Sequence, residues 1–236
     1  MREDLIVEQE QRAIYEKLAH IVVRNLSKKY INAQYTSSKE EALSIVMDLI
    51  PFGATVGTAD SVTVLQLGVF SELRKRGRNE IINPFVRNEE GYMVAGDEER
   101  ANLMRKVFFS DVYVIGTNAI TLDGKLVNID GYGNRVAAMI FGPKKVIIVV
   151  GANKIVKGVD EALKRIREVC APINAMRHAI KHHRPEFLEF PCVRTGICTD
   201  CNHPWRICHF TNIIDGESER RRGHINVVIV GESLGI

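Results

Sequence analysis

The chain has 236 residues, of which 45% are hydrophobic and 26% charged, a composition typical of a globular protein with one large domain. Its 32 basic and 29 acidic residues leave a net charge of +3, too small to indicate a nucleic-acid partner. No apolar run approaches the length of a membrane span, and the charged first residues do not resemble a secretory signal. We therefore expect a cytoplasmic protein with neither a nucleic-acid nor a membrane partner.

Residues 1–50 predict two amphipathic N-terminal helices. Apolar residues recur at helical spacing through 14–22, which indicates a long first helix. Ser38, followed by Glu41 three positions later, has the sequence of a capping box and predicts where the second helix begins. Because proline lacks the backbone N–H, we expect this helix to stop before Pro51.

After these helices, helical patterns alternate with short runs of β-branched residues. The runs at 112–115, 146–150 and 227–230 are continuously apolar and do not alternate with polar residues. Such strands are buried on both faces, which is typical of a parallel sheet covered by helices. We therefore predict one α/β domain over residues 1–236, a layered, mostly parallel sheet flanked by helices. Shorter strands are expected at 54–56 and 80–82, and helices at 61–73, 97–108 and 159–166.

Two polar regions follow predicted strands, at the edge where open α/β sheets bind their ligands. The first is VGTADSVT, in which Gly57 permits close approach of the backbone and Thr58, Asp60 and Ser61 stand at a helix start. The free N–H groups of a helix N-terminus attract anions. Capping alone needs only one such side chain, so we expect these four residues to bind a small anion; simple capping is the alternative.

The second polar region spans residues 116–156. TLDGKLVN predicts a β-hairpin with Asp-Gly at its turn, and NIDGYGNRV then gathers polar side chains around two glycines at a helix start. The strand at 146–150 is followed by GANK, which directs Asn153 and Lys154 to the same edge of the sheet. We expect Lys154 to pair with a phosphate or carboxylate; an ordinary surface lysine is the alternative. The candidate ligand-binding residues of this region are Asn118, Asn128, Asp130, Asn134, Arg135 and Lys154.

Four weaker patterns do not predict a function. GESLG matches the nucleophile elbow around Ser233, but no helix or triad partner follows it in this sequence. GYGNRV lacks the third glycine of a dinucleotide fingerprint. His178 and His182 have the spacing of metal ligands, yet their basic neighbours favour a solvated helix. The basic run at 219–224 is typical of an exposed loop.

The segments GTADSVT, GTNAITLDGKLVNIDGYGNRVA, GPKKVIIVVGANKIV and INVVIVGESLG together resemble the lactate-utilisation (LUD) domain family, and the match covers most of the chain. The resemblance implies a fold similar to the ribose-phosphate isomerase, sugar-phosphate deaminase and CoA-transferase superfamily, in agreement with the layered sheet. It also implies a link to the oxidation of L-lactate to pyruvate alongside iron–sulfur partners. The chain lacks the paired ferredoxin-like cysteine runs of the larger iron–sulfur member, and no catalytic residue carries over from the family.

Four of the five cysteines lie in a loop-like insertion before the last strand, residues 185–223. Cys192, Cys198, Cys201 and Cys208 have the spacing C-x5-C-x2-C-x6-C. In a reducing compartment such thiols favour a metal over structural disulfides, and the central C-x2-C has the bite of one metal ion. We expect an iron–sulfur cluster, because these sites accept irregular spacing and the resemblance favours redox chemistry. Structural zinc, and thiols or disulfides without a metal, are the alternatives.

Three functions follow from these features. The first is a redox or accessory protein of 2-hydroxy-acid (lactate) metabolism, which binds a small anionic metabolite and works with redox partner proteins. The second is a non-redox enzyme acting on a phosphosugar or CoA ester, with carboxylate chemistry at Asp60 or Asp130 and a zinc ion bracing the insertion. The third is a binding or regulatory module without turnover. We expect the cysteines to lie close to loops 57–61 and 128–135, although a parallel final strand would start from the opposite edge of the sheet.

Overall fold

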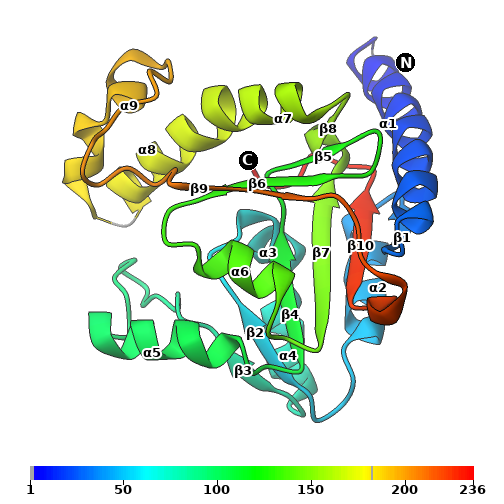
Figure 1. Ribbon diagram of the computed structural model, residues 1–236, viewed down its shortest axis with the longest axis horizontal. Coiled ribbons are helices and arrows are strands. Elements are labelled where there is room, and N and C mark those ends of the chain that lie inside the picture. The colour runs from blue at the N-terminus through cyan, green and yellow to red at the C-terminus, as the bar shows by residue number, and fades with distance from the viewer. Residues whose placement is uncertain (1–2, 182) are drawn as a thin grey trace.

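A parallel sheet of six strands forms the centre of the protein (Figure 1). The computed structural model describes residues 3–181 and 183–236. Across the sheet the strands are β1 (Asn32–Thr36), β10 (Ile225–Val230), β7 (Lys145–Gly151), β4 (Val112–Gly116), β2 (Thr55–Thr58) and β3 (Glu80–Ile82). Every neighbouring pair is parallel, so the carboxyl ends of all six strands meet at one edge. The predicted α/β fold is confirmed.

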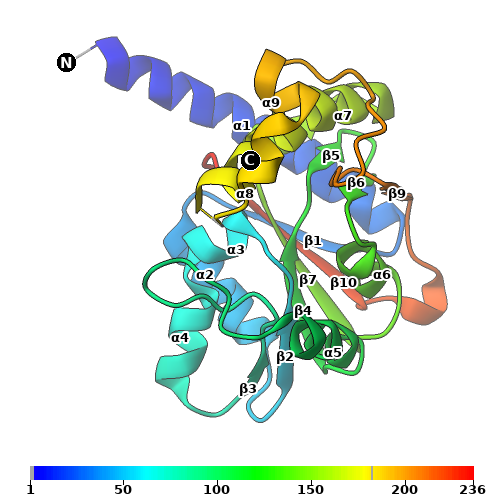
Figure 2. The same cartoon turned by 90° about the vertical axis from the view of Figure 1, so that its left-hand side faces the viewer.

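Helices cover both faces of this sheet, as Figures 1 and 2 show. One face carries α2 (Lys39–Leu49), α3 (Val62–Leu67) and α4 (Val69–Arg76). The other carries α1 (Glu3–Lys28), α5 (Asp97–Val107) and α6 (Asn134–Ile140). Two further helices, α7 (Val159–Arg165) and α8 (Ala171–Lys181), run across the carboxyl edge and are joined by a π-helical turn, Ile166–Cys170. Along the described part of the chain, no helix is both long enough and apolar enough to span a membrane.

A second sheet of four strands packs on the same face as α1. Its order is β8 (Ile155–Val156), β5 (Ala119–Thr121), β6 (Leu126–Asp130) and β9 (Phe210–Ile214). β5 and β6 form the predicted antiparallel hairpin, and Gly124 at its turn has the left-handed φ of +80° that the Asp-Gly sequence indicates. The hairpin brings the end of β6 to the carboxyl edge of the main sheet.

The continuously apolar strands are buried on both faces, which confirms their predicted position. In β4, Val112 and Val114 contact the core beneath α2, α3 and α4, while Tyr113 and Ile115 contact the core beneath α1 and α6. Because side chains alternate along a strand, each of these strands supplies both cores. Burial of each such side chain stabilises the fold by about 1.5–3 kcal/mol.

The second helix begins and ends where the sequence predicts. The Ser38 hydroxyl accepts a hydrogen bond from Glu41 N at 3.3 Å, and the helix stops at Leu49, before Pro51. The Glu41 carboxylate accepts hydrogen bonds from the hydroxyls of Thr36 and Ser37, and so ties the end of β1 to the helix start.

Two features of the N-terminal half differ from the prediction. Residues 1–50 contain the edge strand β1 between the two helices, which the polar sequence NAQYT does not reveal. The helix expected at 61–73 is interrupted, because Gly68 adopts a φ of +80°, ends α3 and begins α4. Within α3 the buried residues are Thr63, Val64 and Leu67, and Leu65 is 54% exposed.

The Cys-rich insertion is not entirely loop-like. It contains a short helix, α9 (Pro191–Thr195), and strand β9, which pairs antiparallel with β6 from Phe210 opposite Asp130 to Ile214 opposite Leu126. β9 therefore carries the chain from the carboxyl edge, beside the cysteines, down to the opposite edge where β10 begins. This return strand explains how a parallel final strand is compatible with cysteines beside the predicted ligand loops.

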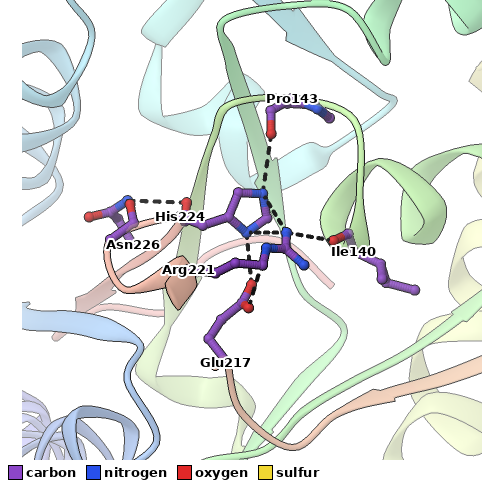
Figure 3. A network of polar contacts seen from close by, with 7 residues as sticks. Ile140, Pro143, Glu217, Arg221, His224 and Asn226 are labelled. Carbon is purple, nitrogen blue, oxygen red and sulfur yellow. Dashed lines mark hydrogen bonds and ion pairs between the residues drawn. The ribbon is translucent and has the colours of Figure 1, made fainter. Parts of the chain in front are cut away.

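A buried polar network fixes the turn between β9 and β10 (Figure 3). The His224 ring, 9% exposed, contacts the Glu217 carboxylate at 2.8 Å through Nδ1 and the Pro143 main-chain oxygen at 3.2 Å through Nε2. Arg221 donates to the main-chain oxygen of Ile140 at 2.8 Å and lies 3.6 Å from Glu217. The basic run at 219–224, predicted as an exposed loop, thus has two residues in a structural network.

Candidate functional site

A cavity of about 460 Å³ opens at the carboxyl edge of the main sheet. Its walls come from the loops that follow β2, β4 and β6, from the π-helical turn and α8, and from the Cys-rich insertion. This is the edge at which open α/β sheets bind ligands. The cavity is the candidate functional site.

The loop after β2 contributes two of its four predicted residues to the wall, Asp60 and Ser61. The Asp60 carboxylate accepts two hydrogen bonds from the Arg177 guanidinium, both at 2.9 Å, which join this loop to α8. Ser61 caps α3 through its hydroxyl. Gly57 and Thr58 lie below the cavity: a Cβ at Gly57 would come within 2.8 Å of a neighbouring serine hydroxyl, and the Thr58 hydroxyl donates to main-chain oxygens.

The loops after β4 and β6 are held together by Arg135. Its guanidinium donates to Asn128 Oδ1 at 2.8 Å, to Asn118 Oδ1 at 3.0 Å and to the main-chain oxygen of Ile129 at 2.8 Å. All three acceptors are neutral. Asp130, the nearest predicted carboxylate, instead accepts hydrogen bonds from the backbone N–H groups of Gly131, Arg135 and Val136. Within residues 3–181 and 183–236, no carboxylate therefore forms an ion pair with Arg135.

The predicted residues of this second region do not all face the cavity. Asn118, Asp130, Asn134 and Arg135 line it. Asn128 is fully buried behind Arg135, where its Oδ1 accepts hydrogen bonds and its Nδ2 has no partner among the described residues. Asn128 thus orients the arginine instead of forming part of the wall.

Lys154 lies in the wall of the cavity but is only 3% exposed. Its Nζ donates to Thr63 Oγ1 at 3.0 Å and to the main-chain oxygen of Thr117 at 3.3 Å, and it forms no ion pair with any described residue. Burial lowers the pKa of Lys154 to about 8, because the ammonium loses its hydration without gaining a neighbouring carboxylate. Lys154 is not an ordinary surface lysine.

The closing residues of the chain pack over Lys154. Leu234 N donates to Asn153 Oδ1 at 3.1 Å, and Gly235 N donates to Gln66 Oε1 at 2.6 Å. A Cβ at Gly235 would come within 2.6 Å of Lys154 Nζ, so only glycine fits in this position without displacement. GESLG therefore forms a cover over the lysine, and Ser233 within it is exposed.

A buried cysteine outside the predicted cluster also lines the cavity. Cys170, 5% exposed, ends the π-helical turn, and its Sγ lies 2.9 Å from Arg165 Nη1. Burial raises the pKa of the Cys170 thiol, although Arg165 and Lys154 act in the opposite direction. A single cysteine at the end of an amphipathic helix gives no signal in the sequence that would distinguish it from a core residue.

Basic side chains outnumber acidic ones around the cavity. The basic residues in its wall are Arg87, Arg100, Arg135, Lys154, Arg177, Arg184 and Arg206. The carboxylate side chains in the wall are those of Asp60 and Asp130. Most of the arginines were not predicted, because they come from α5 and the loop before it, from α8 and the turn after it, and from the insertion, far from the strand ends. His178 of α8 also lines the wall and stacks on Phe187, whereas His182 lies outside the described residues.

The four cysteines of the insertion gather beside this cavity. Burial raises the pKa of Cys192, and the neighbouring Cys201, Cys198 and Cys208 raise it further, so the four sulfurs lie within range of one another's charge. Cys208 itself lines the cavity. Within the described ranges, no three His, Cys, Asp or Glu side chains form a group arranged to hold a metal ion. The donor set of four half-buried thiols nevertheless fits a thiophilic metal in its chemistry.

The insertion is anchored to the cavity wall by direct contacts. His209 N donates to the main-chain oxygen of Asp130 at 2.9 Å. A Cβ at Gly131 would touch the backbone of Ile207 at 3.4 Å. The Arg206 guanidinium donates to the main-chain oxygens of Cys201 and Cys208. The cysteine-bearing segment therefore forms one side of the site.

A family model for the LUD domain matches residues 19–230. None of the curated proteins compared with the chain matches it. Among solved structures, a DUF162 family protein from Deinococcus radiodurans is similar, at 13% identity and a TM-score of 0.49, over 92% of this chain and 97% of that one.

Two more distant structures are similar over about half of the chain. The eIF2B delta protein from Chaetomium thermophilum shares 18% identity over 53% of this chain and 50% of its own, with a TM-score of 0.35. Ribose 5-phosphate isomerase from Plasmodium falciparum shares 18% identity over 50% and 52%, with a TM-score of 0.33. At these scores the structural likenesses carry no functional argument.

Proposed function

Because the chain belongs to the LUD-domain family, and so at family level to the lactate-utilisation-related proteins, we propose that it binds a small anionic metabolite, a 2-hydroxy or 2-oxo acid, in the cavity at the carboxyl edge of its sheet. One observation carries the proposal: the wall of this cavity holds seven basic side chains and two carboxylate side chains. A cavity with such an excess of positive charge favours an anion.

Three of the seven cations, Arg87, Arg135 and Lys154, form no ion pair with a carboxylate in the described part of the chain, and the last two support the proposal most. Arg135 donates only to neutral oxygens, and Lys154 donates only to a hydroxyl and a main-chain oxygen. Arg135 also lowers the pKa of Lys154, so the two charges are close enough to repel each other. A carboxylate bound between them would relieve this repulsion and supply the missing counter-charge, with the planar guanidinium able to hold it through two hydrogen bonds.

We propose further that Cys192, Cys198, Cys201 and Cys208 hold an iron–sulfur cluster, with zinc as the alternative. The support is the donor set itself, four thiols within range of one another's charge. A cluster there would supply one-electron transfer beside the cavity, to or from a redox partner protein. The protein's own residues would bind and orient the acid.

A second candidate function has one observation in its favour, the size of the cavity. About 460 Å³ lies within the range of sites for ligands much larger than a three-carbon acid. A phosphosugar or a CoA ester would use the same cations for its phosphate groups, with zinc only bracing the insertion. This alternative predicts that phosphorylated ligands bind more tightly than lactate or pyruvate.

Ligand titration separates the two candidates. We expect lactate or pyruvate to raise the melting temperature of the protein and to bind in calorimetry, and sugar phosphates and CoA to have smaller effects. Arg135→Met should weaken binding by about tenfold to a hundredfold, since it removes a charge-assisted pair of roughly 1.5–3 kcal/mol. Arg24→Gln, on the exposed side of α1, is the matched control and should bind as the unmodified protein does. Equal binding by both variants would contradict the proposed site.

Metal analysis after anaerobic purification tests the cysteine proposal. A cluster would give a brown protein that contains iron and absorbs near ~400 nm. Zinc without iron would support the structural alternative. A protein that takes up neither metal during anaerobic reconstitution would exclude both.

A further inference from the structure

We propose that Lys154 is a catalytic residue that forms a covalent imine with the carbonyl carbon of an anionic aldehyde or ketone bound in the cavity. The proposal rests on the proposed anion site and names the chemistry that the site performs. The anionic group of the substrate would lie on the arginines, and the carbonyl would face Nζ. A 2-oxo acid and a sugar phosphate in its open-chain form share this chemistry.

The surroundings of Lys154 are those of a reactive amine. No other lysine lines the described part of the cavity wall, and the side chain of Lys154 is almost completely buried. A buried lysine with a structural role normally has a carboxylate partner, because an unpaired ammonium is costly to bury. Lys154 Nζ instead contacts Thr63 Oγ1 and the Thr117 main-chain oxygen, two neutral acceptors that leave the amine free to lose its proton.

The free amine is abundant near neutral pH. With a pKa of about 8 instead of 10.5, roughly a quarter of the lysine is deprotonated at pH 7.5, against about one part in a thousand for an ordinary lysine. Desolvation in an apolar pocket and nearby cations are the two ways in which proteins activate a nucleophilic lysine. Both act here, since burial lowers the pKa and Arg165 and Arg135 lower it further.

The bond changes balance without an oxidant or reductant. The nitrogen lone pair attacks the carbonyl carbon and the C–N bond forms. The carbonyl oxygen takes up both hydrogens of the amine and leaves as one molecule of water, which gives the imine. The segment that ends the chain covers the lysine from outside, with Gly235 packed against Nζ, so bulk water is kept from the bond once it has formed.

Borohydride trapping tests the proposal. The protein is incubated with pyruvate, or separately with ribose 5-phosphate, and then reduced with sodium borohydride. Hydride adds to the imine carbon, so the protein should gain the mass of the carbonyl compound less one oxygen atom. Peptide mapping should place the modification on Lys154. Acetone, which has a ketone but no charge, should give much less product, and the two anionic probes show which anionic group the cavity prefers.

The controls distinguish this inference from the proposed function. Lys157→Arg removes an exposed lysine three residues away and should leave the yield unchanged. Lys154→Arg should abolish the adduct while the same probe still raises the melting temperature; Lys154→Met serves if the arginine variant does not fold. The adduct should also form more slowly at pH 6 than at pH 8, where roughly fifty times more of the lysine is free amine.

Two results would overturn the imine proposal. The first is an undiminished adduct in the Lys154 variants, and the second is the absence of an adduct with probes that do bind the unmodified protein. In both cases the anion site would stand without the imine. If no anionic carbonyl compound binds at all, the proposed function fails first and the imine falls with it.

Discussion

The packing of Gly235 against Lys154 allows a quantitative test of the site. Gly235 has a left-handed φ of +71°, and a Cβ there would come within 2.6 Å of Lys154 Nζ and closer still to Thr63 Oγ1. Gly235→Ala therefore has two costs. The left-handed backbone costs a residue with a Cβ roughly 1–2 kcal/mol. Inserting a methyl group into a filled space costs typically about 1–3 kcal/mol more.

Gly53 provides the matched control for this change. Its φ is +81°, but a Cβ there would meet nothing within 4 Å. Gly53→Ala should therefore lower the free energy of unfolding by the backbone cost alone, roughly 1–2 kcal/mol. Both substitutions restrict the unfolded chain equally, so this effect cancels in the comparison. We expect Gly235→Ala to be less stable than Gly53→Ala by about 1–3 kcal/mol.

Urea denaturation of the two variants measures this difference. Gly235→Ala should also weaken binding of anionic ligands, because the new methyl group displaces Lys154 Nζ from Thr63. Gly53→Ala should bind normally, since it lies far from the cavity wall. Two variants with the same stability and the same affinity would show that Gly235 does not hold the lysine in place.

Three further predictions follow from individual residues. The pKa of Lys154 is lower in the folded than in the unfolded protein, so the unfolded chain binds more protons between pH 8 and 10.5. The free energy of unfolding should therefore rise by about 3 kcal/mol across this pH range. Urea denaturation at successive pH values measures this rise, which Lys154→Met should abolish. The hydroxyl of Tyr113 is fully buried and has no hydrogen-bond partner in the part of the chain that the structure describes. Tyr113→Phe should therefore raise the free energy of unfolding by about 1 kcal/mol, and a lower value would point to an interaction of the hydroxyl. Cys201→Ser should lower the metal content after anaerobic reconstitution, while Cys170→Ser should leave it unchanged, because Cys170 lies beneath Arg165, apart from the four clustered thiols.

The fold was predictable wherever burial leaves a continuous or periodic pattern. The strands at 112–115, 146–150 and 227–230 are apolar throughout because both of their faces are covered. β1 and β9 escaped prediction because they are edge strands, whose exposed positions accept polar residues. The break at Gly68 also escaped, since an isolated glycine within a helical pattern is compatible with an unbroken helix.

The candidate site was predictable only where it lies on the strand-end loops. Asp60, Asn118 and Lys154 follow strands of the main sheet, and the rule for parallel sheets brings them to one edge. Arg135 follows β6 of the second sheet, whose hairpin ends at the same edge. Arg177 belongs to the site through its pairing with Asp60, 117 positions away in the sequence. No local pattern records a contact of that range, because it depends on how α8 crosses the edge of the sheet.

The position of the insertion links the two halves of the proposed function. Arg206 lines the cavity and at the same time holds the main-chain oxygens of Cys201 and Cys208. His209 N, directly after Cys208, donates to the main-chain oxygen of Asp130 on the opposite loop. A metal that fixed the four sulfurs would therefore fix one wall of the cavity, and a ligand that ordered this wall would hold the sulfurs in return. The affinity for the metal and the affinity for the anion should consequently depend on each other, whichever metal is bound.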